Sequence, residues 1–417
     1  MDHLTILLIL AIAFGFFMAW GVGANDVANA MGASVGSHSI TIKQAIIIAA
    51  IFEASGALLA GGQVTDTIRS NIINPIHLTG PPEVLIYGML AALLAAGTWL
   101  LIATHYGWPV STTHSIIGAI IGFGLLNLGA HAIQWGKVTE IALSWVVTPV
   151  LSGVLAYFIF RSIQRLIFVS FDPIKNAKKY LPFYVFFVAF IISMVTFTKG
   201  LKHVGIMLNT FENLFASMSI ALLCTLISYY FLRRVRIDAT VRRRERFRNV
   251  EKIFAILVVF TACAMAFAHG SNDVANAIGP LAAVVSLIND GAMAAQKTAI
   301  PIWVLFIGAA GIVMGLTMYG YKVIATIGTH ITELTPSRAF AAEIATASTV
   351  VIASGTGMPI STTQTLVGAI LGVGLARGIA ALRLNVIRNI FMSWVITLPA
   401  GALLAALYFL ILAWVFA

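Results

Sequence analysis

Long runs of apolar residues recur along the whole chain, separated by short stretches that carry charged residues, glycine or proline. A helix needs about 20 apolar residues to cross the hydrocarbon core of a bilayer, and about twelve of these runs approach that length. They lie near residues 4–23, 43–62, 84–104, 110–128, 139–160, 181–198, 212–232, 252–269, 298–318, 339–357, 360–376 and 388–415. The pattern therefore predicts an all-α polytopic membrane protein with about 12 membrane segments.

The composition excludes a soluble globular protein. Of the 417 residues, 60% are hydrophobic and 10% are charged, whereas about a quarter of the residues in a soluble domain are charged. The two cysteines, Cys224 and Cys263, lie inside apolar runs, which argues against a disulfide framework and against a cysteine-built metal site. The first apolar run has no basic flank, so we interpret it as a membrane segment and not as a cleaved signal peptide.

The distribution of basic residues predicts the orientation of the segments. If the connection from Arg161 to Lys179 is cytoplasmic, alternation places both termini outside and the basic loop at residues 233–252 inside. This assignment leaves 20 of the 25 Lys and Arg residues inside. The net charge of +10 is then explained by membrane insertion, so we expect no nucleic-acid partner. We expect the plasma membrane as the location, which in a bacterium is the inner membrane, and the basic loop is suited to contact anionic lipid.

Two motifs occur twice, in the same order. Residues 23–30 (GANDVANA) return at 270–277 (GSNDVANA), and residues 109–113 (PVSTT) return at 359–363 (PISTT). On the predicted topology the first half starts outside and the second starts inside, which is the inverted-repeat architecture of secondary transporters, with discontinuous or re-entrant helices and a substrate site near the bilayer midplane. We therefore divide the chain into a first repeat at 1–160, connecting segments with two spans and the basic loop at 161–250, and a second, inverted repeat at 251–417.

The first motif is a cluster of polar residues inside apolar sequence. The helical spacing of Asn25, Asp26 and Asn29 brings all three side chains to one face, and the second copy repeats them as Asn272, Asp273 and Asn276. A carboxylate inside a bilayer is costly unless it is paired or hydrated, so the two aspartates are candidates for binding a hard cation such as Na⁺ or for carrying a proton. The alternative is a cluster that joins helices or caps a broken one, and nearby glycines indicate such a break.

The second motif has the features of a helix start, because proline fits the first turn and Ser or Thr caps the free amides. Such an end binds anions, and two copies would form a pocket rich in hydrogen-bond donors that suits a tetrahedral oxyanion. Neither copy contains an arginine, so binding would depend on neutral donors and on cations held nearby. The alternative is ordinary capping of short helices. The hydroxyl residues are Ser111, Thr112, Thr113, Ser361, Thr362 and Thr363.

Two glutamates also lie inside apolar runs. Glu53 and Glu343 could each balance the charge of a cation or carry a proton, although Glu343 could instead reach the interface or pair with Arg338. His114 follows the first Ser-Thr-Thr element at the position where the second repeat has Gln364, and a proton-linked role is open to it.

At these motifs the sequence resembles the inorganic phosphate transporter (PiT) family. The resemblance covers about residues 4–160 and 250–415, and the connecting region lacks the long central domain that many members insert. It implies uptake of inorganic phosphate coupled to Na⁺ or H⁺, with both termini outside. It assigns cation and substrate roles to Asn25, Asp26, Asn29, Asn272, Asp273 and Asn276, phosphate binding to the six Ser and Thr residues, and importance to the intramembrane acids Glu53 and Glu343, while Gln364 continues its motif. Some similar proteins move sulfate, and some carry neutral metal phosphate. The resemblance therefore does not decide which anion and which coupling ion are transported.

These observations predict a cation-coupled phosphate symporter that alternates between outward and inward states around a midplane site. Phosphate would bind at the Ser and Thr residues, Gln364, Asn25 and Asn272, and the coupling ion at Asp26, Asn29, Asp273, Asn276, Glu53 and Glu343, with no cofactor besides Na⁺ or H⁺. The partners would be inorganic phosphate and the lipid bilayer, with a homodimer as a plausible assembly. The alternatives are a sulfate or other oxyanion permease of the same architecture, an intramembrane aspartyl protease built on the two aspartates, and a channel.

Overall fold

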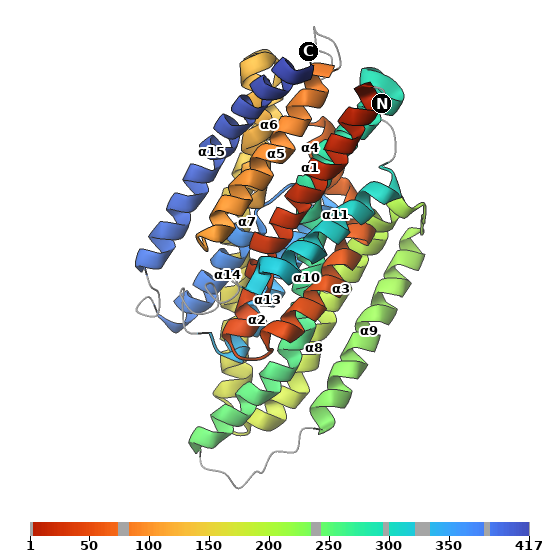
Figure 1. The fold of residues 1–417 in the computed structure, drawn as a ribbon. Helices are drawn as coiled ribbons and strands as arrows, with labels where there is room; N and C mark the ends of the chain where they lie inside the picture. Colours follow the sequence, from red (N-terminus) through yellow and green to blue (C-terminus); the bar gives the residue numbers. More distant parts are fainter. Residues whose placement is uncertain are drawn as a thin grey trace.

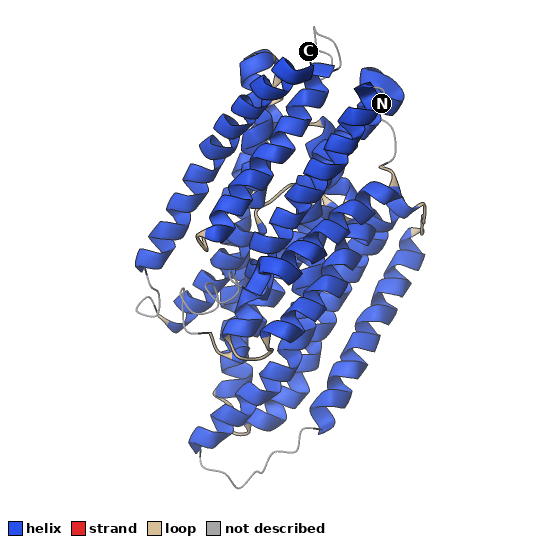
Figure 2. Cartoon of the chain, viewed as in Figure 1, coloured by secondary structure: helices blue, strands red, loops and turns tan. Residues whose placement is uncertain are grey.

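The chain folds into a bundle of helices, as a computed structural model shows (Figure 1). The structure describes residues 3–73, 83–234, 243–294, 300–321, 334–378 and 384–416. Within these ranges there is no β-strand, and the only extended pairing is a single bridge between Ile73 and Ile133 (Figure 2). The prediction of an all-α membrane protein is confirmed.

The helices of the first part of the chain are α1 (His3–Asn25), α2 (Val27–Gly36), α3 (Ile42–Ala60), α4 (Gly62–Ser70), α5 (Glu83–His105), α6 (Thr112–Asn127) and α7 (Trp135–Ile163). Two further helices connect the parts, α8 (Pro173–Val195) and α9 (Thr210–Arg234). The remaining helices are α10 (Arg243–Ala294), α11 (Ile302–Gly315), α13 (Pro336–Gly355), α14 (Thr362–Arg377) and α15 (Leu384–Phe416).

Nine stretches of helix among the described residues are long and apolar enough to cross a membrane, with α1 and α2 counted together. A helix covers each of the twelve predicted segments, but α6, α13 and α14 are not among the nine. Helices α6 and α14 have 16 residues each, which makes them about 24 Å long, shorter than the roughly 30 Å hydrocarbon core. The count of twelve and the inverted repeat therefore stay predictions.

Helix α10 differs most from its predicted extent of 252–269. It is one continuous helix of 52 residues that passes through the second polar motif, and it packs against α1, α3, α4, α5 and α13 in the centre of the bundle (Figure 1). In the first repeat the chain instead breaks, because α1 ends at Asn25 and α2 begins at Val27. The same motif is thus a break in one half and part of a continuous helix in the other, which shows that packing overrides local propensity here.

The two halves interlock through their last two helices. Helix α6 packs along α15, and α14 packs along α7. Glycines bring the backbones together at equivalent places: Gly118 faces the backbone of Leu398, and Gly368 faces the backbone of Pro149. Small residues at such crossings let membrane helices approach closely, so that van der Waals packing can hold them.

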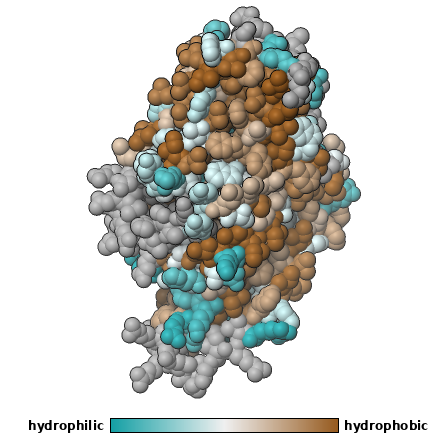
Figure 3. All heavy atoms as spheres, in the orientation of Figure 1, coloured by the Kyte–Doolittle hydropathy of each residue, from teal (hydrophilic) through white to brown (hydrophobic). Residues whose placement is uncertain are grey.

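Large apolar side chains form the outer surface of the bundle. Exposed examples lie on α7, α9 and α15, among them Val146, Phe215 and Leu403. Hydrophobic residues cover much of the middle of the face drawn in Figure 3, and hydrophilic residues gather toward its ends. The rings of His3 and Phe416 are 6.0 Å apart, so the two chain ends lie on the same side of the bundle (Figure 1). Part of the basic loop at 233–252 lies outside the described residues.

We expect replacement of Gly23 by alanine to destabilise the fold. A methyl group at Gly23 would collide with the backbone of Ile312 on α11, which cannot turn aside as a flexible side chain would. Overpacking of this kind lowers the free energy of unfolding by about 1–3 kcal/mol, measurable as a lower midpoint of thermal unfolding in detergent. At Gly136 on α7 an added methyl meets nothing within 4 Å, so Gly136→Ala is the matched control; equal midpoints for the two variants would contradict the prediction.

Candidate functional site

Asp26 lies at the break between α1 and α2. Its side chain is buried, 1% exposed, and one carboxylate oxygen accepts a hydrogen bond of 2.6 Å from the Thr112 hydroxyl. The other oxygen accepts a bond of 2.6 Å from the Thr363 hydroxyl. Because Thr112 begins α6 and Thr363 lies in the first turn of α14, this carboxylate joins the starts of two helices from different halves of the chain.

Asp273 occupies the equivalent place on α10. Its Oδ2 atom accepts a hydrogen bond of 2.8 Å from the Thr362 hydroxyl and lies 3.4 Å from the Thr112 hydroxyl. Thr112 is therefore within reach of both aspartates. The sequence predicted that cations held nearby would assist binding at the Ser-Thr-Thr elements, and the structure places both aspartates beside these elements.

The two Ser-Thr-Thr elements are helix starts that face each other. Ser111 caps α6 by accepting a hydrogen bond of 3.2 Å from the backbone N–H of His114, and Ser361 caps α14 through a bond of 3.3 Å from the N–H of Gln364. The Thr113 hydroxyl donates across the interface to the backbone oxygen of Ile360 at 2.9 Å. The six hydroxyl residues are each 1% exposed or less, so the positive ends of two helix dipoles converge in a buried space.

The asparagines fix the turns that precede these helix starts. The Asn25 amide donates to the Thr104 hydroxyl at 3.0 Å and to the backbone oxygen of Trp108 at 3.1 Å. Asn272 does the same in the second half, with bonds of 3.1 Å to Ser354 and 3.2 Å to Met358. This pairing indicates that Asn25 and Asn272 position the Ser-Thr-Thr elements, a role that the sequence did not reveal.

The third asparagine of the second motif has a different neighbourhood. The Asn276 amide donates to the hydroxyls of Thr112 and Thr113 at 3.1 and 3.2 Å, so a residue of the second half holds the helix start of the first. The side chain of its counterpart Asn29 lies outside the described part of the structure.

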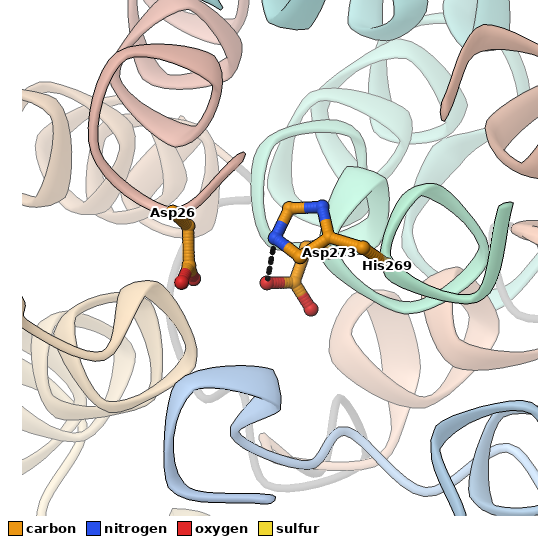
Figure 4. Close-up of side chains that lie close together, drawn as sticks. All are labelled: Asp26, His269 and Asp273. Carbon is orange, nitrogen blue, oxygen red and sulfur yellow. Dashed lines mark ion pairs between the residues drawn. The ribbon is translucent and has the colours of Figure 1, made fainter. Parts of the chain in front are cut away.

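A histidine that the sequence analysis did not select completes the cluster. His269 lies between two acids, with Nδ1 3.2 Å from Glu53 and Nε2 3.2 Å from Asp273. All three side chains are fully buried. Figure 4 shows His269 and Asp273 on α10 facing the same space as Asp26, and one ligand atom from each of these three residues lies within 4.8 Å of the others.

The sequence did carry a signal for His269. It stands four residues before Asp273, a spacing that places both side chains on one helix face. The first repeat has Val22 at the equivalent position, so the histidine is not part of a duplicated motif.

Two predicted residues lie apart from this cluster. Glu343 on α13 accepts hydrogen bonds from the hydroxyls of Ser34 on α2 and Thr261 on α10. Thr261 precedes Asp273 by twelve residues, or about 18 Å along α10, so Glu343 is in a second buried polar site. The side chain of Gln364 lines an apolar cavity together with His114.

The cluster has more acceptors than donors. Asp273 Oδ1, Asn272 Oδ1 and Asn276 Oδ1 are buried and have no hydrogen-bond partner among the described residues. Buried polar atoms normally have partners, and oxygen ligands are what hard cations take. Three carboxylates (Asp26, Asp273 and Glu53) surround one histidine, so the site is suited to hold cations beside the two helix starts.

Comparison with known proteins gives one consistent result. The model of the phosphate transporter family matches residues 22–405. A protein of Haemophilus influenzae that carries the name phosphate permease is 56% identical over 407 residues, which is 98% of this chain and 97% of the relative. The chloroplastic inorganic phosphate transporter 2-1 of Arabidopsis thaliana is 42% identical over 97% of this chain and 71% of its own length.

A solved structure has the same fold. It is described as the sodium-dependent phosphate transporter, and it is 38% identical to this chain, with a TM-score of 0.91 over 98% of this chain and 100% of that structure. Similarity at this level extends across nearly the whole helical bundle.

Proposed function

The chain belongs to the phosphate transporter family, and from this premise we propose that it takes up inorganic phosphate by symport with a cation, Na⁺ or H⁺. Its relatives are transporters and permeases, so the chain is not an enzyme and the intramembrane protease is excluded. The observation that carries the proposal is the meeting of two buried helix starts with two aspartates that accept hydrogen bonds from them.

Phosphate binds, on this proposal, between the starts of α6 and α14. Backbone N–H groups and helix dipoles favour an anion there, and the threonine hydroxyls are the available side-chain donors. Ser111 and Ser361 already serve as caps, so we assign direct contact with phosphate first to Thr112, Thr113, Thr362 and Thr363.

The cation neutralises the aspartates before phosphate enters. Thr112, Thr362 and Thr363 donate to Asp26 and Asp273, and two buried carboxylates would repel an incoming anion. A cation on the carboxylates weakens that repulsion and frees the hydroxyls to turn toward phosphate. Binding is therefore ordered, and phosphate alone binds poorly.

We propose Na⁺ as the coupling ion, held by Asp26, Asp273, Asn29 and Asn276. The unpartnered oxygens of Asp273 and Asn276 support this choice, as does the sodium dependence stated for the similar solved structure. A proton carried by His269 and Glu53 is the second candidate, supported by their buried ion pair. Glu343 lies apart from the site, and we assign it to the path of the ion.

Transport follows from alternate opening of the site on either side. The turn before α14 is covered, because Thr67 of α4 donates to the backbone oxygen of Gly357 at 2.7 Å. The turn before α6 is more exposed, with Tyr106 64% and Trp108 47% exposed. This asymmetry supports a state closed on the α4 side, and the two repeats, of opposite topology, exchange these roles.

For the setting, we propose the plasma membrane with both termini outside and the loop at 233–252 in the cytoplasm. The positive-inside distribution supports that orientation. A homodimer is compatible with this setting.

Uptake of labelled phosphate into proteoliposomes tests the proposal. Vesicles with the purified protein are given an inward Na⁺ gradient, an inward H⁺ gradient or neither, and we expect accumulation with Na⁺ at least about tenfold above the other two conditions. Accumulation driven by H⁺ alone would assign coupling to His269 and Glu53. No phosphate movement under any gradient, with sulfate moving instead, would replace this function by that of an oxyanion permease.

A further inference from the structure

A cavity of about 880 Å³ lies behind the phosphate-site helices, between α7, α14 and α15. Its walls are almost entirely apolar, with Val150, Phe158 and Val395 among the residues that line it. These three side chains are 61%, 63% and 68% exposed and belong to helices long and apolar enough to span the membrane. The cavity therefore opens toward the hydrocarbon of the bilayer.

The cavity is elongated and lies at hydrocarbon depth. On α7 it extends from Ala142 to Phe158, which corresponds to about 24 Å of helix. Helix α7 begins at Trp135 and ends at Ile163, so the lining residues occupy its central part. A volume in this range fits a drug-sized or lipid-sized molecule.

Polar atoms without partners lie at one part of this apolar wall. His114 and Gln364, 3% and 4% exposed, occupy equivalent positions in the two repeats and both line the cavity. His114 Nε2, Gln364 Oε1 and the indole Nε1 of Trp145 have no hydrogen-bond partner among the described residues. The rings of His114 and Trp145 are 3.9 Å apart.

The neighbouring backbone fixes the hydrogen-bonding character of His114. Its Nδ1 atom is 3.4 Å from the backbone oxygen of Trp394, which can only accept, so Nδ1 carries the proton in the neutral ring and Nε2 is an acceptor. The wall thus offers an acceptor at His114 or Gln364, whose side chains lie close enough to interact with each other, and a donor at Trp145. A ligand whose head group matches this wall must both donate and accept a hydrogen bond.

We propose that this cavity binds a long-chain fatty acid in its neutral carboxylic acid form. Its O–H would donate to His114 Nε2 or Gln364 Oε1, and its carbonyl would accept from Trp145. An acyl chain gains little by leaving the bilayer for an apolar wall, since lipid tails are equally apolar. The hydrogen bonds therefore select the ligand, and a phospholipid, whose polar head stays at the interface, cannot provide them at this depth.

Photolabelling in liposomes tests this inference. A fatty acid with a diazirine in its chain should label peptides of α7 and α14, and unlabelled palmitic acid should compete with it. His114→Phe should reduce this labelling about fivefold, as expected for one lost hydrogen bond. Val150→Trp, which fills the cavity, should reduce it at least as much, whereas Leu143→Trp, an exposed position on α7 that does not line the cavity, should not.

Three results would overturn the inference. The first is equal labelling of α7 by a phospholipid that carries the same diazirine chain, and the second is labelling that Val150→Trp does not change. The third is disulfide formation between two copies of a Val150→Cys variant in liposomes, because it would show that this face is an interface between copies and not a lipid site. The labelling readout does not depend on phosphate transport, so the two proposals can fail separately.

Discussion

Replacement of Asp26 by asparagine should reduce cation-driven phosphate uptake by about a hundredfold or more. The substitution keeps the shape of the side chain and removes its charge. Hydrogen bonds to a charged group contribute about 1.5–3 kcal/mol each, and Asp26 accepts such bonds from Thr112 and Thr363. On the proposed function, the substitution also removes a charge that offsets the charge of the coupling cation inside the bilayer.

The measurement is the initial rate of labelled phosphate uptake in proteoliposomes, with the amount of folded protein determined by size-exclusion chromatography. Asp172→Asn is the matched control, because Asp172 is an exposed carboxylate that caps α8 through a bond to the N–H of Lys175. We expect the control to transport at the wild-type rate. An Asp26→Asn protein that transports as fast as the control would remove Asp26 from the cation site.

Replacement of His269 by glutamine should lower both stability and transport. The histidine separates Glu53 from Asp273, and removal of one partner from a buried charged pair costs about 3–5 kcal/mol. We expect a lower midpoint of thermal unfolding in detergent and at least about a tenfold loss of uptake. Glutamine can still donate a hydrogen bond to one of the two acids. The decrease in stability and uptake therefore measures the loss of the histidine's charge and of its contact with the other acid.

A double-variant cycle separates the charge from the shape. If the ion pair is the cause, Glu53→Gln combined with His269→Gln should unfold at a higher temperature than His269→Gln alone, because the buried charge left without a partner is gone. Uptake should stay low in the double variant. Strictly additive effects of the two substitutions on stability would show that the two side chains do not interact.

The duplicated motifs predicted the residues that meet at the centre of the candidate site. Asp26, Asp273 and the threonines could be identified because an acid inside an apolar run is costly and a Pro-x-Ser-Thr-Thr element begins a helix. The contact of these residues across the two halves is part of the tertiary structure. It could still be expected from the repeat, because equivalent elements of two repeats meet near the midplane.

The features that could not be predicted from the sequence are not duplicated in the two halves of the chain. His269 has no counterpart, because Val22 stands in its place. Glu343 resembles Glu53 in residue type and in its apolar sequence surroundings, but its hydroxyl partners come from α2 and α10, which no local pattern could show. The continuity of α10 through its motif also depends on packing on several sides, and local sequence carries little information about that.

The pairing of α6 with α15 has a consequence for synthesis of the chain. Helix α6 ends at Asn127, and its main partner begins at Leu384, so a ribosome adding about 5–20 residues per second needs roughly 13–50 s to supply it. During that interval the glycine-lined face of a short helix is already made while its partner is absent. Assembly of the first half therefore waits for the last helix, and a nascent chain that stops before α15 leaves this face open to quality-control proteases and to the wrong helices.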